Sequence, residues 1–178
     1  MNVLDAKRAY LAGLLEALQR CVYFLDASDK RLAWPLSAEL LEQRKKDVAL
    51  FESMAAINER FAKLQDTLGA AMRHASLLSG EPADTFLKLL GFYEKAGVLE
   101  SVESWQLCRT TRNLAAHDYE TDYAEIADHF NSLHTLIPLL YGDASRFIDY
   151  AETALDIAPK QGDFSEDFVD IVQKNRHV

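Results

Sequence analysis

Apolar residues recur at helical spacing along most of the chain. One such series near the start consists of Leu4, Leu11, Leu14, Leu15, Leu18 and Val22. A second series advances in three- and four-residue steps through Ile57, Phe61, Leu64, Leu68 and Met72. Steps of three and four place side chains along one side of an α-helix, so both segments are predicted to form amphipathic helices. The first is expected over about residues 4–24.

Polar breaks and capping residues set the bounds of the other predicted helices. Ser37, followed by Glu39 in the first turn, is typical of a helix N-terminus. It predicts a helical stretch to about Leu78, as one kinked helix or as two helices. Further helices are predicted over residues 84–95, 101–116 and 122–140. Pro138 and Gly142 stand near the end of the last of these, and residues 143–157 are predicted to form a separate helix or a kinked continuation.

These elements predict an all-α, up-and-down bundle of four to six helices, because no internal repeat and no alternating strand pattern is found. The chain has 178 residues with 7 Gly and 4 Pro, a composition that favours one helical domain. We assign residues 1–142 to the bundle and residues 143–178 to a C-terminal helical extension and polar tail, packed on the bundle or trailing from it. After Pro159 we expect a loosely held segment, apart from a turn at residues 164–172.

The formal net charge of −9 counts against a protein that coats nucleic acid through a generally basic surface. It leaves room for a local basic cleft that engages one phosphate, and it suits a basic protein partner. We expect no membrane association, because no apolar run reaches the length of a membrane span. Cys21 and Cys108 lie far apart without paired spacing, so they are predicted to be buried free thiols of a cytoplasmic protein.

Residues 112–119 read R-N-L-A-A-H-D-Y and concentrate the chemical groups of the chain. Arg112 supplies a fixed cation, Asn113 an amide, His117 a base that titrates near neutral pH, and Tyr119 a phenol. This set suits phosphate-ester chemistry.

Helical geometry constrains how these groups can act together. At about 100° per residue, Arg112 shares an otherwise apolar face with Trp105 and Cys108, so its guanidinium needs anionic or carbonyl partners. Asn113 and His117 are neighbours on another face. Arg112 and His117 lie roughly 140° apart and could not grip the same phosphate from one straight helix. Either the helix ends near Ala116 and turns His117 inward, or two chains contribute to the site.

Structural roles compete with these functional ones. A single histidine near a helix C-terminus often complements the helix dipole, and a single arginine on an apolar face is commonly a structural tie. Asn113 could be a structural amide and Tyr119 an aromatic residue at the edge of the core. His129 and His134 are five residues apart with acidic neighbours, but no supporting pair of ligands appears on a second helix. We therefore predict no metal site and no cofactor.

The motif at residues 112–119 resembles the R-x4-H-x-Y signature of the HEPN superfamily, especially the HepT-like toxins encoded with a nucleotidyltransferase antitoxin. The asparagine directly after the arginine is part of this resemblance, as is the position late in the penultimate major helix of a small bundle. Residues 60–66, which read R-F-A-K-L-Q-D, are similar to the companion helix of those proteins. The resemblance covers roughly residues 4–142.

The resemblance implies a homodimer in which two copies of the motif face each other across a cleft, and metal-independent cleavage of RNA to a 2′,3′-cyclic phosphate. Arg112 and His117 are then expected to be catalytic, with Asn113 orienting the histidine or the phosphate. Tyr119 is expected to receive AMP from the partner nucleotidyltransferase, which silences the toxin. The alternative is a non-catalytic subunit of a nucleotidyltransferase complex that binds a nucleotide or the partner.

Overall fold

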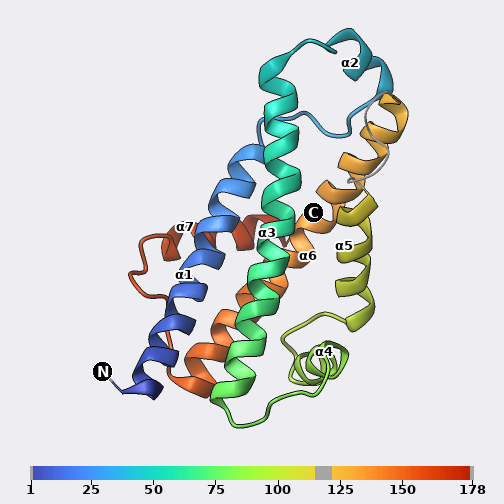
Figure 1. Ribbon diagram of the computed structural model, residues 1–178. Coiled ribbons are helices and arrows are strands. Elements are labelled where there is room, and N and C mark those ends of the chain that lie inside the picture. Colours follow the sequence, from blue (N-terminus) through green and yellow to red (C-terminus); the bar gives the residue numbers. More distant parts are fainter. Residues whose placement is uncertain (1, 115–121, 177–178) are drawn as a thin grey trace.

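The computed structural model describes residues 2–114 and 122–176, and within these ranges the chain forms helices and no strands (Figure 1). The predicted all-α helical bundle is therefore confirmed. The helices are α1 (Val3–Asp29), α2 (Ala38–Gln43), α3 (Val48–Leu78), α4 (Phe86–Lys95), α5 (Val102–Leu114), α6 (Tyr123–Leu155) and α7 (Ser165–Asn175). None of the helices in these ranges is both long and apolar enough to cross a lipid bilayer.

Side-chain caps explain where several helices begin. Ser37 accepts a hydrogen bond from the backbone N–H of Leu40 at the start of α2, as its sequence context predicts. Asp47 caps α3 in the same way through Leu50, after a short turn at residues 44–47. The long stretch predicted from Ser37 to Leu78 is thus two helices rather than one kinked helix.

The longest helix, α6, runs without interruption through Pro138 and Gly142. Residues 143–155 continue the helix that begins at Tyr123, in agreement with the second of the two alternatives for that segment. Residues 142 and 143 are consecutive positions of this helix, so the bundle and the C-terminal extension meet inside α6 and not at a loop.

The C-terminal segment is held more firmly than the polar sequence suggested, so the expectation of a loose tail was wrong. Helix α7 packs on α1 and α6 and buries Phe168, Ile171 and Val172. The preceding loop is fixed by Glu16, whose carboxylate accepts three backbone N–H groups from residues 161–163 at 2.8–3.2 Å. Three apolar positions at helical spacing are enough to dock this short helix.

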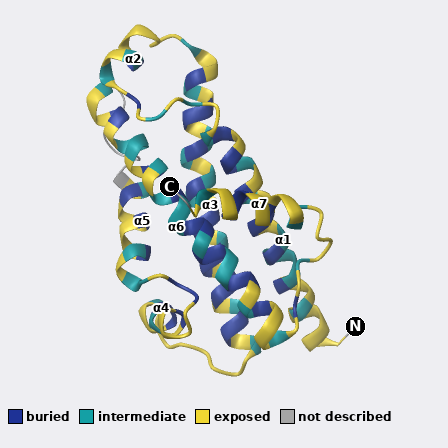
Figure 2. Cartoon of the chain, turned by 180° about the vertical axis from the view of Figure 1, so that it is seen from behind, coloured by how far each residue is buried: buried dark blue, intermediate teal, exposed yellow. Residues whose placement is uncertain are grey.

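The core lies where α1, α3 and α6 face one another, with α5 against α3 and α6 (Figure 2). The predicted series on α3 is confirmed, since all five of its members are fully buried. On α1, Leu11, Leu15, Leu18 and Val22 are also fully buried. Leu4 is exposed because it lies in the first turn of the helix, at the end of the bundle.

One carboxylate, that of Asp143 on α6, is 0% exposed. It accepts hydrogen bonds from the backbone N–H of Glu100 at 3.0 Å and from Arg146 at 2.6 Å. Burial nevertheless outweighs these contacts and raises the pKa of Asp143 to about 6 from an ordinary value of 3.8. The folded state therefore binds this proton more tightly than the unfolded state does.

The stability of the fold is expected to depend on pH through Asp143. Because the folded pKa lies above the unfolded one, the stabilisation is complete below about pH 4 and is lost as pH rises through about 6. A shift of this size corresponds to at most about 3 kcal/mol. Urea unfolding of wild type and Asp143→Asn between pH 4 and 7 should show the wild type gaining free energy of unfolding relative to the variant as pH falls. If the free energies of unfolding of wild type and variant changed in parallel with pH, the raised pKa would not belong to Asp143.

Candidate functional site

Arg112 lies near the end of α5 and its side chain is 15% exposed. Nη1 donates to the backbone carbonyl of Ala62 at 2.7 Å, and Nη2 donates to Oδ1 of Asp66, also at 2.7 Å. The prediction that this guanidinium needs carbonyl or anionic partners is confirmed, since it has one of each. Both partners belong to residues 60–66 of α3, the segment already noted for its sequence.

These contacts tie α5 to α3, and a third contact lies close by. The buried side chain of Gln65 donates from Nε2 to the carbonyl of Trp105 at 2.8 Å. The Nε atom of Arg112 is buried and has no hydrogen-bond partner among the described residues. Asp66, in contrast, keeps 64% of its side chain exposed, so its ion pair with Arg112 is open to solvent and to competing anions.

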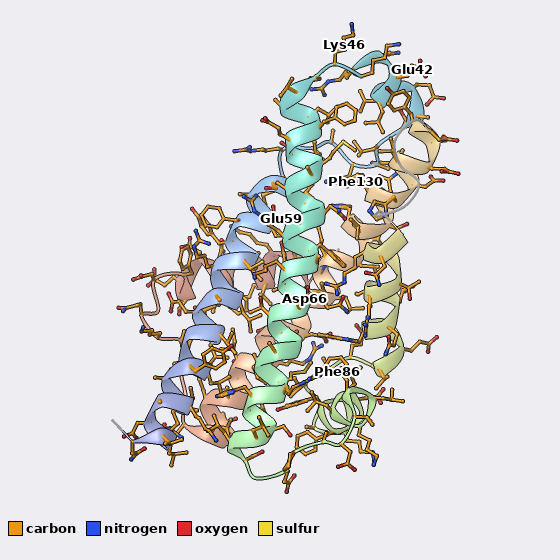
Figure 3. The ribbon with its side chains drawn as sticks, in the orientation of Figure 1. Glu42, Lys46, Glu59, Asp66, Phe86 and Phe130 are labelled. Carbon is orange, nitrogen blue, oxygen red and sulfur yellow. The ribbon has the colours of Figure 1, made fainter. Side chains whose placement is uncertain are left out.

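A cavity of about 500 Å³ opens between α3, the start of α4 and α5. We call it the arginine cavity, and its principal lining residues are Asp66, Arg73, Phe86, Trp105, Arg109 and Arg112. Figure 3 shows Asp66 on α3 and Phe86 at the start of α4, with α5 beside them. Among the described residues, three guanidinium groups share this cavity with one carboxylate, although the chain as a whole carries a net charge of −9.

The inner wall of the arginine cavity depends on the absence of a side chain at Gly69. A Cβ atom at this position would lie 3.3 Å from Cζ of Phe86 and 3.6 Å from Cζ2 of Trp105. The two aromatic rings therefore approach the backbone of α3 closely. The guanidinium carbon of Arg73 lies 5.3 Å from the centre of the Phe86 ring, a cation–π contact that holds the arginine at the cavity.

The other residues of the motif are placed only in part. Asn113 is exposed on α5, away from the apolar face on which Trp105 and Cys108 are buried, as the helical geometry predicted. His117 and Tyr119 lie outside the described residues. The structure therefore brings Arg112 to the cavity. That Arg112 and His117 act at one site stays a prediction.

The two histidines of α6 have separate surroundings. His134 forms a 2.8 Å hydrogen bond from Nδ1 to Oδ1 of Asp29, and its ring stacks on Trp34 at 4.3 Å. His129 is half-buried beside a second cavity of about 720 Å³ between α3 and α6, and burial lowers its pKa. In the described part of the chain, no three His, Cys, Asp or Glu side chains are grouped so that they could hold a metal ion.

The two cysteines are free thiols. Burial raises the pKa of Cys21 to about 11 and that of Cys108 to about 12. Both therefore stay protonated at neutral pH, and neither has the thiolate character of a nucleophile.

Sequence reasoning missed Arg73, Arg109 and Phe86 as members of the site. Arg73 stands near the end of α3, outside the motif at residues 112–119. Arg109 offered one signal, because it lies three residues before Arg112 and so on the same side of the helix. Phe86 offered none, since only the packing of α4 on α3 brings its ring to the cavity.

No family model, curated protein or solved structure is significantly similar to this chain.

Proposed function

We propose that this chain is a HEPN-type, metal-independent endoribonuclease toxin that acts as a homodimer and is neutralised by a partner nucleotidyltransferase. The observation that carries the proposal is the R-N-x3-H-x-Y pattern, which begins in the last turn of α5 of an all-helical chain. Its first residue, Arg112, lines a cavity together with two further arginines. A cationic cavity in an acidic protein supports a phosphate ester as the substrate.

The proposed reaction needs no group beyond the motif and the RNA. One His117 removes the proton of a ribose 2′-OH, whose oxygen attacks the adjacent phosphorus. The second His117 of the dimer donates a proton to the departing 5′-oxygen. Arg112 stabilises the additional negative charge on the phosphate oxygens, for which a planar guanidinium is well suited. The products are a 2′,3′-cyclic phosphate and a free 5′-hydroxyl.

Asp66 is proposed to hold Arg112 in position until RNA binds. Its carboxylate is largely exposed, so separating it from the guanidinium costs little, whereas Ala62 continues to hold Nη1 from the backbone. A phosphate oxygen can then replace the carboxylate oxygen at Nη2. Arg112 in this scheme is both a tie between helices and a ligand for the substrate.

Tyr119 is proposed as the point of control. Transfer of AMP from the partner nucleotidyltransferase to its phenol would place a bulky, negatively charged group two residues from His117. RNA is then excluded by size and by charge repulsion. The modified protein should bind oligoribonucleotides less tightly than the unmodified protein.

A second candidate is a non-catalytic, nucleotide-binding subunit of a nucleotidyltransferase complex. The contacts of Arg112 with Ala62 and Asp66 favour it, because they are those of a structural tie. This candidate predicts nucleotide binding or stable co-purification with the partner, without turnover of RNA.

Expression in cells that lack the partner separates the two candidates. Wild type should arrest growth and His117→Ala should not, because loss of the general base removes cleavage. The purified wild type should also cleave RNA in the presence of EDTA, with size-exclusion chromatography confirming that the variant keeps the same oligomeric state. A wild type that is harmless in cells and inert on a broad set of RNAs would rule out the ribonuclease.

A further inference from the structure

We infer that the arginine cavity is a binding site for the phosphate of a nucleotide unit, in which Arg73 and Arg109 hold the phosphate. The source of that phosphate is an RNA strand, at a position next to the bond that is cut. The choice of RNA rests on the proposed function, whereas the binding of a nucleotide phosphate does not. Neither arginine belongs to the R-N-x3-H-x-Y motif, so this site extends beyond the proposed catalytic residues.

Charge is the first argument. Arg73 on α3 and Arg109 on α5 are exposed side chains from two different helices that line one cavity. Among the described residues, Arg112 is the only arginine of the cavity with a carboxylate partner. Two further guanidinium groups that line one cavity carry like charges, and an anion between them relieves their repulsion. Planar guanidinium donors match phosphate oxygens in geometry.

The aromatic wall is the second argument. Arg73 is held over the ring of Phe86, and Phe86 in turn lies against Trp105 with ring centres 6.1 Å apart. The position of the guanidinium is therefore largely set before a ligand binds. A guanidinium fixed in this way offers both hydrogen-bond donors to a phosphate and a flat surface for a nucleobase.

The carboxylate of Asp66 in this cavity favours a nucleotide over an acidic peptide. Asp66 repels any anion, but its exposed oxygens can accept hydrogen bonds from sugar hydroxyls, which the acidic side chains of a peptide do not offer. The volume of about 500 Å³ lies within the range of small-molecule sites, roughly 300–1,000 Å³. Arginines, an aromatic wall and one hydroxyl acceptor together correspond to the three parts of a nucleotide.

Ala70 provides the sharpest test, because it is exposed on α3 and lines the cavity without contributing charge. Ala70→Glu should weaken binding of a fluorescent 2′-O-methyl oligoribonucleotide by about tenfold, and Ala70→Lys should bind at least as tightly as wild type. The 2′-O-methyl groups block the attacking hydroxyl, so binding is measured without cleavage. Circular dichroism would show that both variants keep the helical fold.

Arg20 supplies a matched control for the two arginines that are proposed to bind the phosphate. Its guanidinium carbon lies 4.9 Å from the centre of the Phe24 ring, the same kind of contact as that of Arg73, but outside the arginine cavity. Arg73→Gln and Arg109→Gln should each weaken binding by about tenfold, and Arg20→Gln should leave it unchanged. All three variants lose one positive charge, so a general change in net charge is controlled.

Competition with AMP and with inorganic phosphate identifies the source of the phosphate. An oligonucleotide that binds far more tightly than AMP supports an RNA strand, and equal affinity supports a free nucleotide at the same site. Equal binding by Ala70→Glu and Ala70→Lys would overturn the inference. If RNA were cleaved but the charge at position 70 had no effect on binding, the proposed function would still hold and only the binding site would be wrong. If binding depended on that charge but no RNA were cleaved, the binding site would still hold and the ribonuclease would be ruled out.

Discussion

Replacing Arg112 with alanine should lower the rate of RNA cleavage by about a hundredfold to a thousandfold. In the proposed reaction its guanidinium stabilises charge that develops on the phosphate, and removal of one such group commonly costs two to three orders of magnitude. The variant also loses the contacts with Ala62 and Asp66, so its free energy of unfolding should fall by about 2 kcal/mol. Cleavage of a labelled oligoribonucleotide and urea unfolding measure the two effects separately.

Asp66→Asn separates the structural role of Arg112 from its catalytic role. It removes the charge from the same ion pair but leaves the guanidinium in place, and the exposure of Asp66 makes the loss of stability small, below about 1 kcal/mol. Cleavage should stay within a few-fold of wild type. Arg112→Lys keeps the positive charge but not the planar pair of donors, so it should remain at least about a hundredfold slower. If Asp66→Asn were as inactive as Arg112→Ala, Arg112 would act only through the fold.

The sequence predicted those features that depend on one helix at a time. The buried series on α3 follows from its spacing alone, because a helix must turn its apolar side toward the core. The need of Arg112 for a carbonyl or an anion follows from its place on the same face of α5 as the buried Trp105 and Cys108. Such deductions require no knowledge of which helix lies opposite.

Features that depend on two helices could not be obtained in this way. The sequence does not specify how far α3 is shifted along α5. The contacts of Arg112 with Ala62 and Asp66 depend on that shift. The same shift brings Arg73 to the cavity that Arg109 lines. Local rules also left open whether the helix continues beyond Pro138. It does so in α6, because packing on neighbouring helices compensates for one lost backbone hydrogen bond.

Tyr93→Ala should lower the free energy of unfolding by about 3–5 kcal/mol, the largest loss of stability expected from a single change in α4. Tyr93 is fully buried, and its hydroxyl donates to the carbonyl of Met72 on α3 at 2.9 Å. Its ring also meets Phe147 and Tyr150 of α6 edge to face, with centres 5.7 and 5.5 Å apart. Truncation leaves a void at the meeting point of three helices and removes the hydrogen bond from the hydroxyl to the Met72 carbonyl.

The same residue connects the core to the arginine cavity, because α4 carries Phe86 as well as Tyr93. Tyr93→Phe keeps the ring and loses only the hydroxyl, so it should cost about 1 kcal/mol and leave oligonucleotide binding unchanged. Tyr93→Ala should weaken binding even under conditions in which the chain stays folded, since the wall that holds Arg73 is no longer fixed. If urea unfolding showed the same loss of free energy of unfolding in Tyr93→Phe and Tyr93→Ala, the stabilisation would come from the hydrogen bond between the hydroxyl and Met72 and not from the ring. Unchanged binding by a folded Tyr93→Ala would show that the cavity keeps its shape without the anchor that this ring provides.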